Sequence, residues 1–149
     1  MADSSEGLGG EARALVVAAR RATLATIAPD GRPRLVPVCF ELVDEHVWIA
    51  IDDKPKRSAD PMDLARVRDV LARPRVTLLV DRWDEDWSRL GWVRIDGRAA
   101  VVESGGPGHA AAINALRAKY PQYRSHALEE RPAIRVSIER VVSWGSLEA

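Results

Sequence analysis

Ala22-Thr-Leu-Ala-Thr-Ile-Ala-Pro-Asp-Gly-Arg-Pro-Arg-Leu-Val-Pro-Val38 is the stretch that decides the fold class. Asp30-Gly31 lies in a short polar segment between two apolar runs, and glycine accepts the positive φ angle that a hairpin turn requires. Pro37 stands within the second run, where it cannot donate a hydrogen bond to a neighbouring strand. The stretch therefore predicts a β-hairpin. Its second strand, residues 34–43, lies at a sheet edge, contains a bulge, or borders something other than a strand.

The rest of the chain adds four strands and three helices to this hairpin. Helices are predicted at residues 11–21, after the helix-start pattern Asp60-Pro61, and at about 109–119. Strand patterns follow at residues 46–51, 76–81, 92–102 and 134–144, with a bulge predicted at Asp96-Gly97. Strands and helices do not alternate regularly, which argues against a parallel sheet. The sequence predicts a mainly β fold, a six-stranded antiparallel barrel with α-helices outside.

The composition limits the classes of protein to which this chain can belong. The 149 residues have a formal net charge of zero, with 46% hydrophobic and 30% charged residues, which fits one globular domain. We expect a flexible N-terminus at residues 1–10 and a cofactor-binding barrel at residues 11–149. Neutral charge disfavours nucleic-acid binding, and no apolar run approaches the roughly 20 residues of a membrane span. Cys39 is the single cysteine, so we expect a cytoplasmic protein without a bound metal.

A cluster of positive charge stands out in this neutral chain. Lys54-Pro55-Lys56-Arg57 directly follows the strand pattern at residues 47–51. Two-residue spacing in extended backbone points Lys54 and Lys56 to one side, and Pro55 favours that extension. The run suits a phosphate group. The alternative interpretation is a solvated basic loop.

Taken in order, these segments resemble the split-barrel superfamily of flavin- and deazaflavin-binding proteins that includes pyridoxamine 5'-phosphate oxidase. Three pieces carry the resemblance: the hairpin at residues 23–38, the strand Trp48-Ile-Ala-Ile-Asp52 before the basic run, and the helix ending at Leu71-Ala-Arg-Pro74 with the strands after it. The resemblance covers residues 12–144. The short length, the basic run and Asp84-Glu-Asp-Trp-Ser88 are most similar to the actinobacterial branch that depends on coenzyme F420, a deazaflavin.

The resemblance implies a homodimer with two cofactor sites in the grooves between subunits. Lys54, Lys56 and Arg57 would hold the cofactor phosphate, and Trp144 of the second subunit would flank the ring. The ring would lie along Val36, Pro37 and Val38. The backbone of a second strand segment would contact the cofactor: Trp48, Ile49, Ala50 and Ile51.

The implied activity is hydride transfer between coenzyme F420 and a small unsaturated or heteroaromatic substrate. Such a cofactor supplies the hydride chemistry, which agrees with a sequence that has no nucleophile motif, and no residue is assigned as catalytic. Two alternatives share the fold: an FMN-dependent oxidoreductase, and a non-catalytic module that binds flavin or haem.

Some side chains keep two interpretations. Arg32 and Arg34 either reach a phosphate or are solvated on the hairpin. Trp83 and Trp87 either line a substrate pocket or pack against a second subunit. Trp92 lies in a strand pattern, and we expect it in the core.

Overall fold

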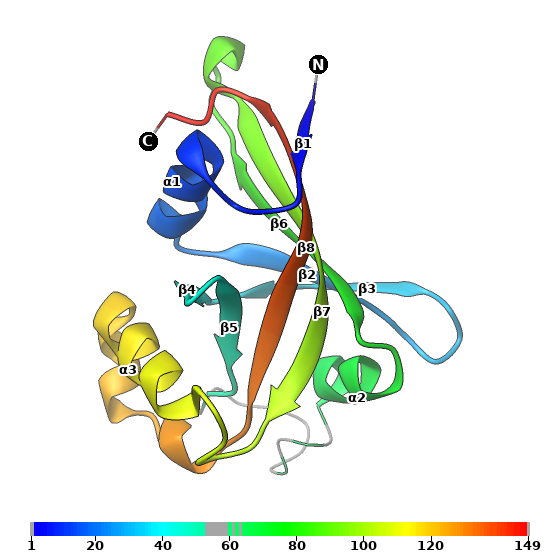
Figure 1. Cartoon of the computed structure of the whole chain (residues 1–149), viewed down its shortest axis with the longest axis vertical. Coiled ribbons are helices and arrows are strands. Elements are labelled where there is room, and N and C mark those ends of the chain that lie inside the picture. Colours follow the sequence, from blue (N-terminus) through cyan, green and yellow to red (C-terminus); the bar gives the residue numbers. More distant parts are fainter. Residues whose placement is uncertain (1, 53–59, 61, 63, 149) are drawn as a thin grey trace.

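The computed structural model describes residues 2–52, 60, 62 and 64–148. In these residues, eight strands form one antiparallel sheet with the order β3-β2-β6-β7-β8-β5-β4, and β1 pairs with β8. The sheet curls into a half-barrel with the α-helices outside it (Figure 1). The strands are β1 (Asp3–Ser5), β2 (Ala22–Ile27), β3 (Pro33–Val38), β4 (Glu41–Val43), β5 (His46–Ala50), β6 (Arg75–Arg82), β7 (Gly91–Val102) and β8 (Ala133–Gly145). The helices are α1 (Gly10–Ala18), α2 (Ala65–Ala72) and α3 (His109–Lys119), with short 3-10 turns η2 (Trp87–Arg89), η3 (Pro121–Ser125) and η4 (Leu128–Glu130).

The two edges of the sheet are joined almost directly along the chain. β3 and β4 are the edge strands, and only Cys39 and Phe40 separate them. The hydroxyl oxygen of Tyr120, just after α3, accepts the N–H of Phe40 at 3.1 Å and lies 3.1 Å from the Phe40 carbonyl oxygen. Tyr120 thereby satisfies backbone groups at the crossing, where neither strand continues. The sheet edges are held together at this end of the barrel.

β5 is buried on both of its faces because it separates two apolar clusters. Val47 and Ile49 pack inside the curled sheet. Trp48 and Ala50 point the other way and pack under α3 beside Leu116. Side chains alternate between the two faces of a strand, so each face of β5 receives an apolar set.

Gly91 of β7 and Gly145 of β8 are register partners, and both stand at a close approach of the backbone. A Cβ atom on Gly91 would lie 2.1 Å from the carbonyl oxygen of Ser146, and one on Gly145 would lie 2.3 Å from that of Leu90. Gly145 also has a φ angle of 85°, a region that favours glycine. The N–H of Ser146 donates to the Leu90 carbonyl at 2.8 Å. Both glycines are therefore needed where the C-terminal segment crosses the start of β7.

The expected fold class is confirmed, but the strand number differs. The sequence predicts six strands, and the described residues form eight. The strand predicted over residues 34–43 is divided into β3 and β4 because the chain passes between sheet edges at Cys39 and Phe40. The hairpin of β2 and β3 and the bulge between Asp96 and Gly97 are confirmed.

α2 begins later than the sequence predicts. Asp60 does not cap α2; its Oδ1 accepts the N–H of Met62 at 3.0 Å. Leu64 is the N-cap, with extended backbone, and α2 starts at Ala65. The helix ends, as predicted, before Pro74.

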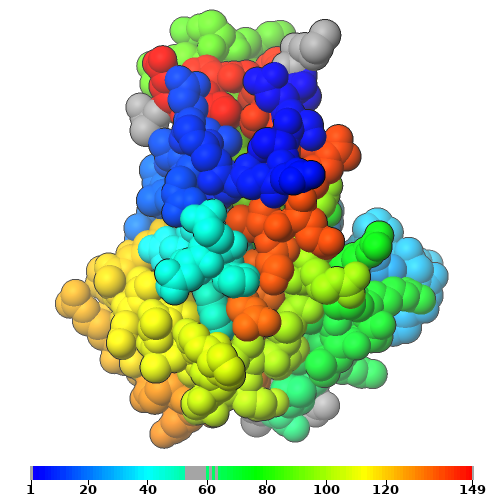
Figure 2. All heavy atoms as spheres, viewed as in Figure 1, coloured from blue at the N-terminus to red at the C-terminus, as the bar shows by residue number. Residues whose placement is uncertain are grey.

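The N-terminal residues pack against the sheet. β1 pairs with Val141–Ser143 of β8, and Figure 2 shows the blue N-terminal residues beside the orange-red end of β8. The division of the chain at residue 10 stays a prediction. Within the described ranges, no helix has the length and apolar character needed to cross a membrane.

Candidate functional site

The barrel is open between β3 and the end of β5. Continuing the register of β4 and β5 past Glu41 would place Val38 opposite Ile51, yet no ladder joins β3 to β5 in the residues described. The free edge of β3 and the backbone at residues 49–51 therefore border an opening in the sheet, which we call the split. The chain leaves this opening at Asp52.

The free edge of β3 is poor in hydrogen-bond donors. Pro33 and Pro37 pair with Ile27 and Thr23 of β2, and proline fits a ladder only when its nitrogen points away from the partner strand. Amide groups of alternate residues point to the same side of a strand. The N–H of Leu35, between the two prolines, therefore points out of the sheet along the split.

α2 connects the two rims of the split. Asp69 Oδ2 accepts the Arg34 Nε of β3 at 2.9 Å and the Thr26 hydroxyl of β2 at 2.8 Å. Arg66 stands three residues earlier, on the same face of the helix. Its electrostatic partner is Asp52, at the end of β5. α2 thus interacts with the β3 rim through Asp69 and with the β5 rim through Arg66.

Arg66 carries a buried donor without an acceptor. The side chain is half-buried, and its Nε is buried and has no hydrogen-bond partner. Burial lowers the pKa of Arg66, while Asp52 and Tyr123 act to raise it. Lys119 Nζ also has no hydrogen-bond partner, but it lies 4.0 Å from the ring centroid of Phe40, which compensates the charge.

Tyr123 fixes the carboxylate at the end of β5. Its hydroxyl donates to Asp52 Oδ2 at 3.1 Å, and its side chain is only 4% exposed. Burial raises the pKa of Tyr123, and the neighbouring Cys39 and Asp52 raise it further. Tyr123 therefore stays protonated at neutral pH and acts as a donor.

Stability is expected to fall above about pH 10 because of Tyr123. Folded Tyr123 holds its proton more tightly than an unfolded tyrosine, whose pKa is about 10. Its contribution is complete below that pH and is lost above it by about 1.4 kcal/mol per pH unit, as the unfolded state deprotonates first. Urea unfolding at several pH values between 8 and 11.5 measures this slope. Tyr123→Phe should have a flatter slope than the natural chain, and equal slopes would contradict the assignment.

The structure places the predicted strand residues at the two rims of the split. Val36 and Val38 point into the core of the barrel, and Pro37 is exposed on the opposite face of β3. The side chains of Trp48, Ile49, Ala50 and Ile51 are buried, so their backbone is what borders the split. Lys54, Lys56 and Arg57 lie outside the described residues, and their phosphate contact stays a prediction.

Trp144 lies on the outer face of the sheet, at the far end of β8 from the β5 rim of its own chain. It is 38% exposed and stands opposite Trp92. Trp92 is half-buried on the same outer face, so its expected core position is wrong. Along β8, Trp144 is eleven residues beyond Ala133, the partner of Ala50. At about 3.3 Å per residue, that separation is roughly 35 Å.

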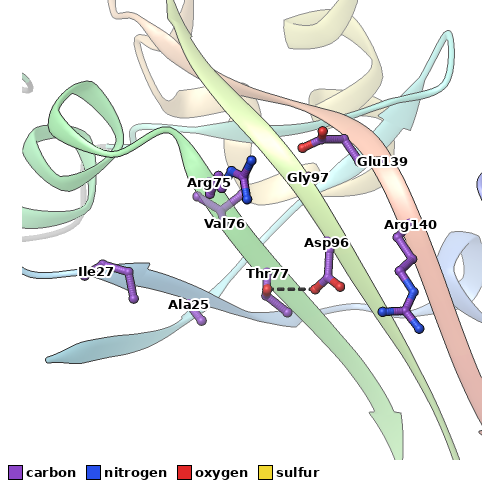
Figure 3. A pocket seen from close by; sticks show the side chains of 9 residues that line it. All are labelled: Ala25, Ile27, Arg75, Val76, Thr77, Asp96, Gly97, Glu139 and Arg140. Carbon is purple, nitrogen blue, oxygen red and sulfur yellow. Dashed lines mark hydrogen bonds between the residues drawn. The ribbon is translucent and has the colours of Figure 1, made fainter. Parts of the chain in front are cut away.

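A hollow of about 450 Å³ lies on the outer face beside the bulge in β7. Figure 3 shows Thr77 and Asp96 side by side, with the Thr77 hydroxyl donating to Asp96 Oδ1 at 2.9 Å. Arg75 and Arg140 also line the hollow, so it carries both signs of charge. Among the residues that the structure describes, none of those predicted to bind a cofactor lines the hollow.

The sequence profile of the pyridoxamine 5'-phosphate oxidase family matches residues 8–145. The chain belongs to this family. The match spans β2 to β8 and therefore includes both rims of the split. The resemblance stated from the sequence is confirmed at the level of the family. No curated protein sequence matches the chain.

Solved structures similar to this family member share its fold. The haem storage protein HutZ from Vibrio cholerae is 16% identical, with a TM-score of 0.70, and the match covers 96% of this chain and 99% of that one. An FAD-binding protein from Mesorhizobium loti is 23% identical, with a TM-score of 0.63 and coverage of 96% and 95%. A protein described as an F420 reductase is 20% identical, with a TM-score of 0.64 and coverage of 87% and 94%.

The other side chains that the sequence singled out as possible ligand contacts lie at separate places on the surface. Arg34 is engaged by buried Asp69, whereas Arg32 is exposed and lies 3.4 Å from Asp30. Trp83 and Trp87 are exposed on the connection between β6 and β7. In the described part of the chain, no group of three or more His, Cys, Asp or Glu side chains is placed to hold a metal ion.

Proposed function

We propose that this chain is an oxidoreductase that transfers a hydride between coenzyme F420 and a small unsaturated or heteroaromatic substrate. The proposal rests on the split. Each of its two rims has a backbone edge without a neighbouring strand among the described residues, and the sequence continues from Ile51 into the basic run at residues 54–57. Membership in the pyridoxamine 5'-phosphate oxidase family and similarity to an F420 reductase support a deazaflavin or flavin cofactor.

The residues around the split fit a flat ring cofactor that carries an anionic group. The N–H of Leu35 points out of the edge of β3, and the buried Nε of Arg66 has no acceptor in the protein. The bound cofactor would supply hydride transfer, so the chain's own residues bind it, orient it and exclude water. The residues proposed to contact it are Val36, Pro37 and Val38 at the ring, the backbone of Trp48, Ile49, Ala50 and Ile51 beside it, and Lys54, Lys56 and Arg57 at the phosphate.

We further propose a homodimer in which Trp144 of the second subunit flanks the ring. Trp144 is separated from the β5 rim of its own split by roughly 35 Å along β8, so a Trp144 that flanks a ring at this rim would come from a second copy. Trp92 stands beside it, and Ile27 and Leu79 are partly exposed on the same face. These apolar side chains would suit a subunit contact. Sedimentation equilibrium of the purified chain measures its mass.

Two alternative functions would use the same site. Similarity to an FAD-binding protein supports a flavin, and FMN is the phosphorylated flavin that the basic run would suit. Similarity to a haem storage protein supports a non-catalytic module. The absorption spectrum of the reconstituted protein distinguishes deazaflavin, flavin and haem. A module without catalytic function would bind its cofactor and show no turnover with any hydride acceptor.

Lys56→Ala combined with Arg57→Ala is expected to weaken cofactor binding at least tenfold without unfolding the protein. Each lost charge-assisted contact would cost about 1.5–3 kcal/mol, and about 1.4 kcal/mol corresponds to tenfold in affinity. Titrations with F420 and with FMN, followed by fluorescence, measure the dissociation constants and identify the preferred cofactor.

Arg68→Ala combined with Arg124→Ala is the matched control, because it removes two positive charges from exposed positions. This variant should bind as tightly as the natural chain. Unchanged affinity of the Lys56 and Arg57 variant for both cofactors would contradict the phosphate assignment.

A further inference from the structure

Two arginines stand directly opposite each other beside the hollow on the outer face of the sheet. Arg75 of β6 and Arg98 of β7 are register partners, so their side chains lie on the same face, and both are exposed. Like charges in such a pair repel each other. Neither arginine forms an ion pair with a carboxylate of the described residues. The fold therefore keeps two positive side chains next to each other without a bound counter-charge.

The two acidic side chains of the hollow do not neutralise this arginine pair. Asp96 Oδ1 accepts the Thr77 hydroxyl at 2.9 Å. Glu139 belongs to β8, and Figure 3 shows it on the far side of Gly97 from Arg75. The edge of the hollow at β6 is therefore positive, and its acidic groups lie toward β7 and β8.

Arg135 adds a third positive charge to this end of the outer face. Arg98 is the register partner of Ser137, and Arg135 stands two residues before Ser137 on the same face of β8. The Nε of Arg135 is buried and has no hydrogen-bond partner. Three neighbouring strands thus each bring an arginine to this place.

Apolar side chains lie on the other side of Arg75. Continuing the register of Ala25 and Thr77 by two residues places Ile27 of β2 beside Arg75, and both alkyl side chains of β2 line the hollow. Leu35 of β3, the register partner of Ala25, is 66% exposed and extends this apolar surface. The volume of about 450 Å³ lies within the range of roughly 300–1,000 Å³ that is typical of small-molecule pockets.

We propose that the hollow is a second ligand site, which binds a small compound with an apolar body and a carboxylate. The carboxylate would lie between Arg75 and Arg98, where its charge offsets their repulsion and its two oxygens accept from both guanidinium groups. The apolar body would lie against Ala25 and Ile27. The inference goes beyond the proposed function and does not depend on it, because the hollow and the split are separate openings.

Octanoate is the probe that tests this site, with two matched compounds. Octan-1-ol has the apolar body without the charge, and acetate has the carboxylate without the body. Two-dimensional ¹⁵N NMR titration of the full chain gives the dissociation constant and the backbone amides that respond. Octanoate is expected to bind at least tenfold more tightly than either matched compound. The largest shifts should occur at residues 25–27, 75–77 and 96–98.

Arg75→Ala and Arg98→Ala are each expected to weaken octanoate binding at least tenfold, because each removes a charge-assisted contact. Octan-1-ol should bind both variants as it binds the natural chain. Arg75→Lys keeps the charge but not the paired donors, so its affinity should lie between those of Arg75→Ala and the natural chain. Arg68→Ala removes an exposed arginine of α2 and should bind octanoate like the natural chain.

Several results would overturn the inference. One is the absence of octanoate binding by the natural chain, which is the result expected if a second copy covers the hollow. Others are equal octanoate affinity in the Arg75 and Arg98 variants and the natural chain, or an equal loss in Arg68→Ala, which indicates a general effect of charge. Shifts centred on residues 35–38 and 49–51 would place the probe in the split instead. The titrations with F420 and FMN test the split independently of these outcomes.

Discussion

A chain in which alanine replaces Gly145 is expected to lose about 2–5 kcal/mol of unfolding free energy. The φ angle of 85° costs an alanine about 1–2 kcal/mol. Its Cβ would also lie 2.3 Å from the Leu90 carbonyl oxygen and 3.0 Å from the Gly91 Cα. Both neighbours are backbone atoms in a paired region, so relieving the overlap costs a further 1–3 kcal/mol or so. Urea unfolding at neutral pH measures the loss.

Gly105→Ala is the matched control for this prediction. Gly105 has a similar φ angle of 79°, but an added Cβ would meet no atom within 4 Å. Its loss should therefore be limited to backbone strain, about 1–2 kcal/mol. Similar losses in the two variants would show that Gly145 does not stand at a close approach of β7 and β8.

Asp69→Ala is expected to cost about 2–3 kcal/mol, the second large effect. The carboxylate is 2% exposed, and its loss leaves the equally buried Thr26 hydroxyl without its acceptor. Arg34 is 42% exposed, so water replaces part of its lost ion pair and this contribution is small. Urea unfolding of the variant measures the total.

Adding Thr26→Val to Asp69→Ala separates the two contributions. Valine has nearly the shape of threonine and no hydroxyl, so the double variant should recover about 1 kcal/mol. Asp81→Ala, at an exposed position of β6, should change stability by less than about 0.5 kcal/mol. A loss at Asp69 as small as that at Asp81 would show that α2 is not held to the β3 rim by this carboxylate.

The sequence was sufficient to predict the elements that have strong local patterns. The Asp30-Gly31 turn and the alternation along β7 depend on neighbouring residues, and both are found in the structure. α3 also agrees with its predicted residues, because the break at Gly105 to Pro107 fixes where it starts. The division of β3 from β4 was not predictable, because the crossing at Phe40 is bonded to Tyr120, eighty residues away.

Of the candidate site, only the residues that lie in continuous strand segments could be predicted from the sequence. Val36 to Val38 and Trp48 to Ile51 were identified through the family resemblance, and the register shows why both segments border one opening. Arg66, Asp69 and Tyr123 were missed because no short motif contains them. One signal was available: Asp69 lies between Val67 and Val70, so a carboxylate stands on the apolar side of α2. An acid in that position indicates a buried partner, but its identity depends on the fold.

The prolines of β3 bear on how this protein avoids aggregation. An unpaired strand edge is a template on which another chain can add a strand. Between Pro33 and Pro37, the outward side of β3 has a single N–H, that of Leu35, whereas a regular ladder needs a donor at every second residue. Binding of a foreign strand along this edge is therefore disfavoured, while a small molecule that needs one donor and open space is not. The same two prolines that leave this side of β3 with a single donor would protect the chain from strand addition during folding.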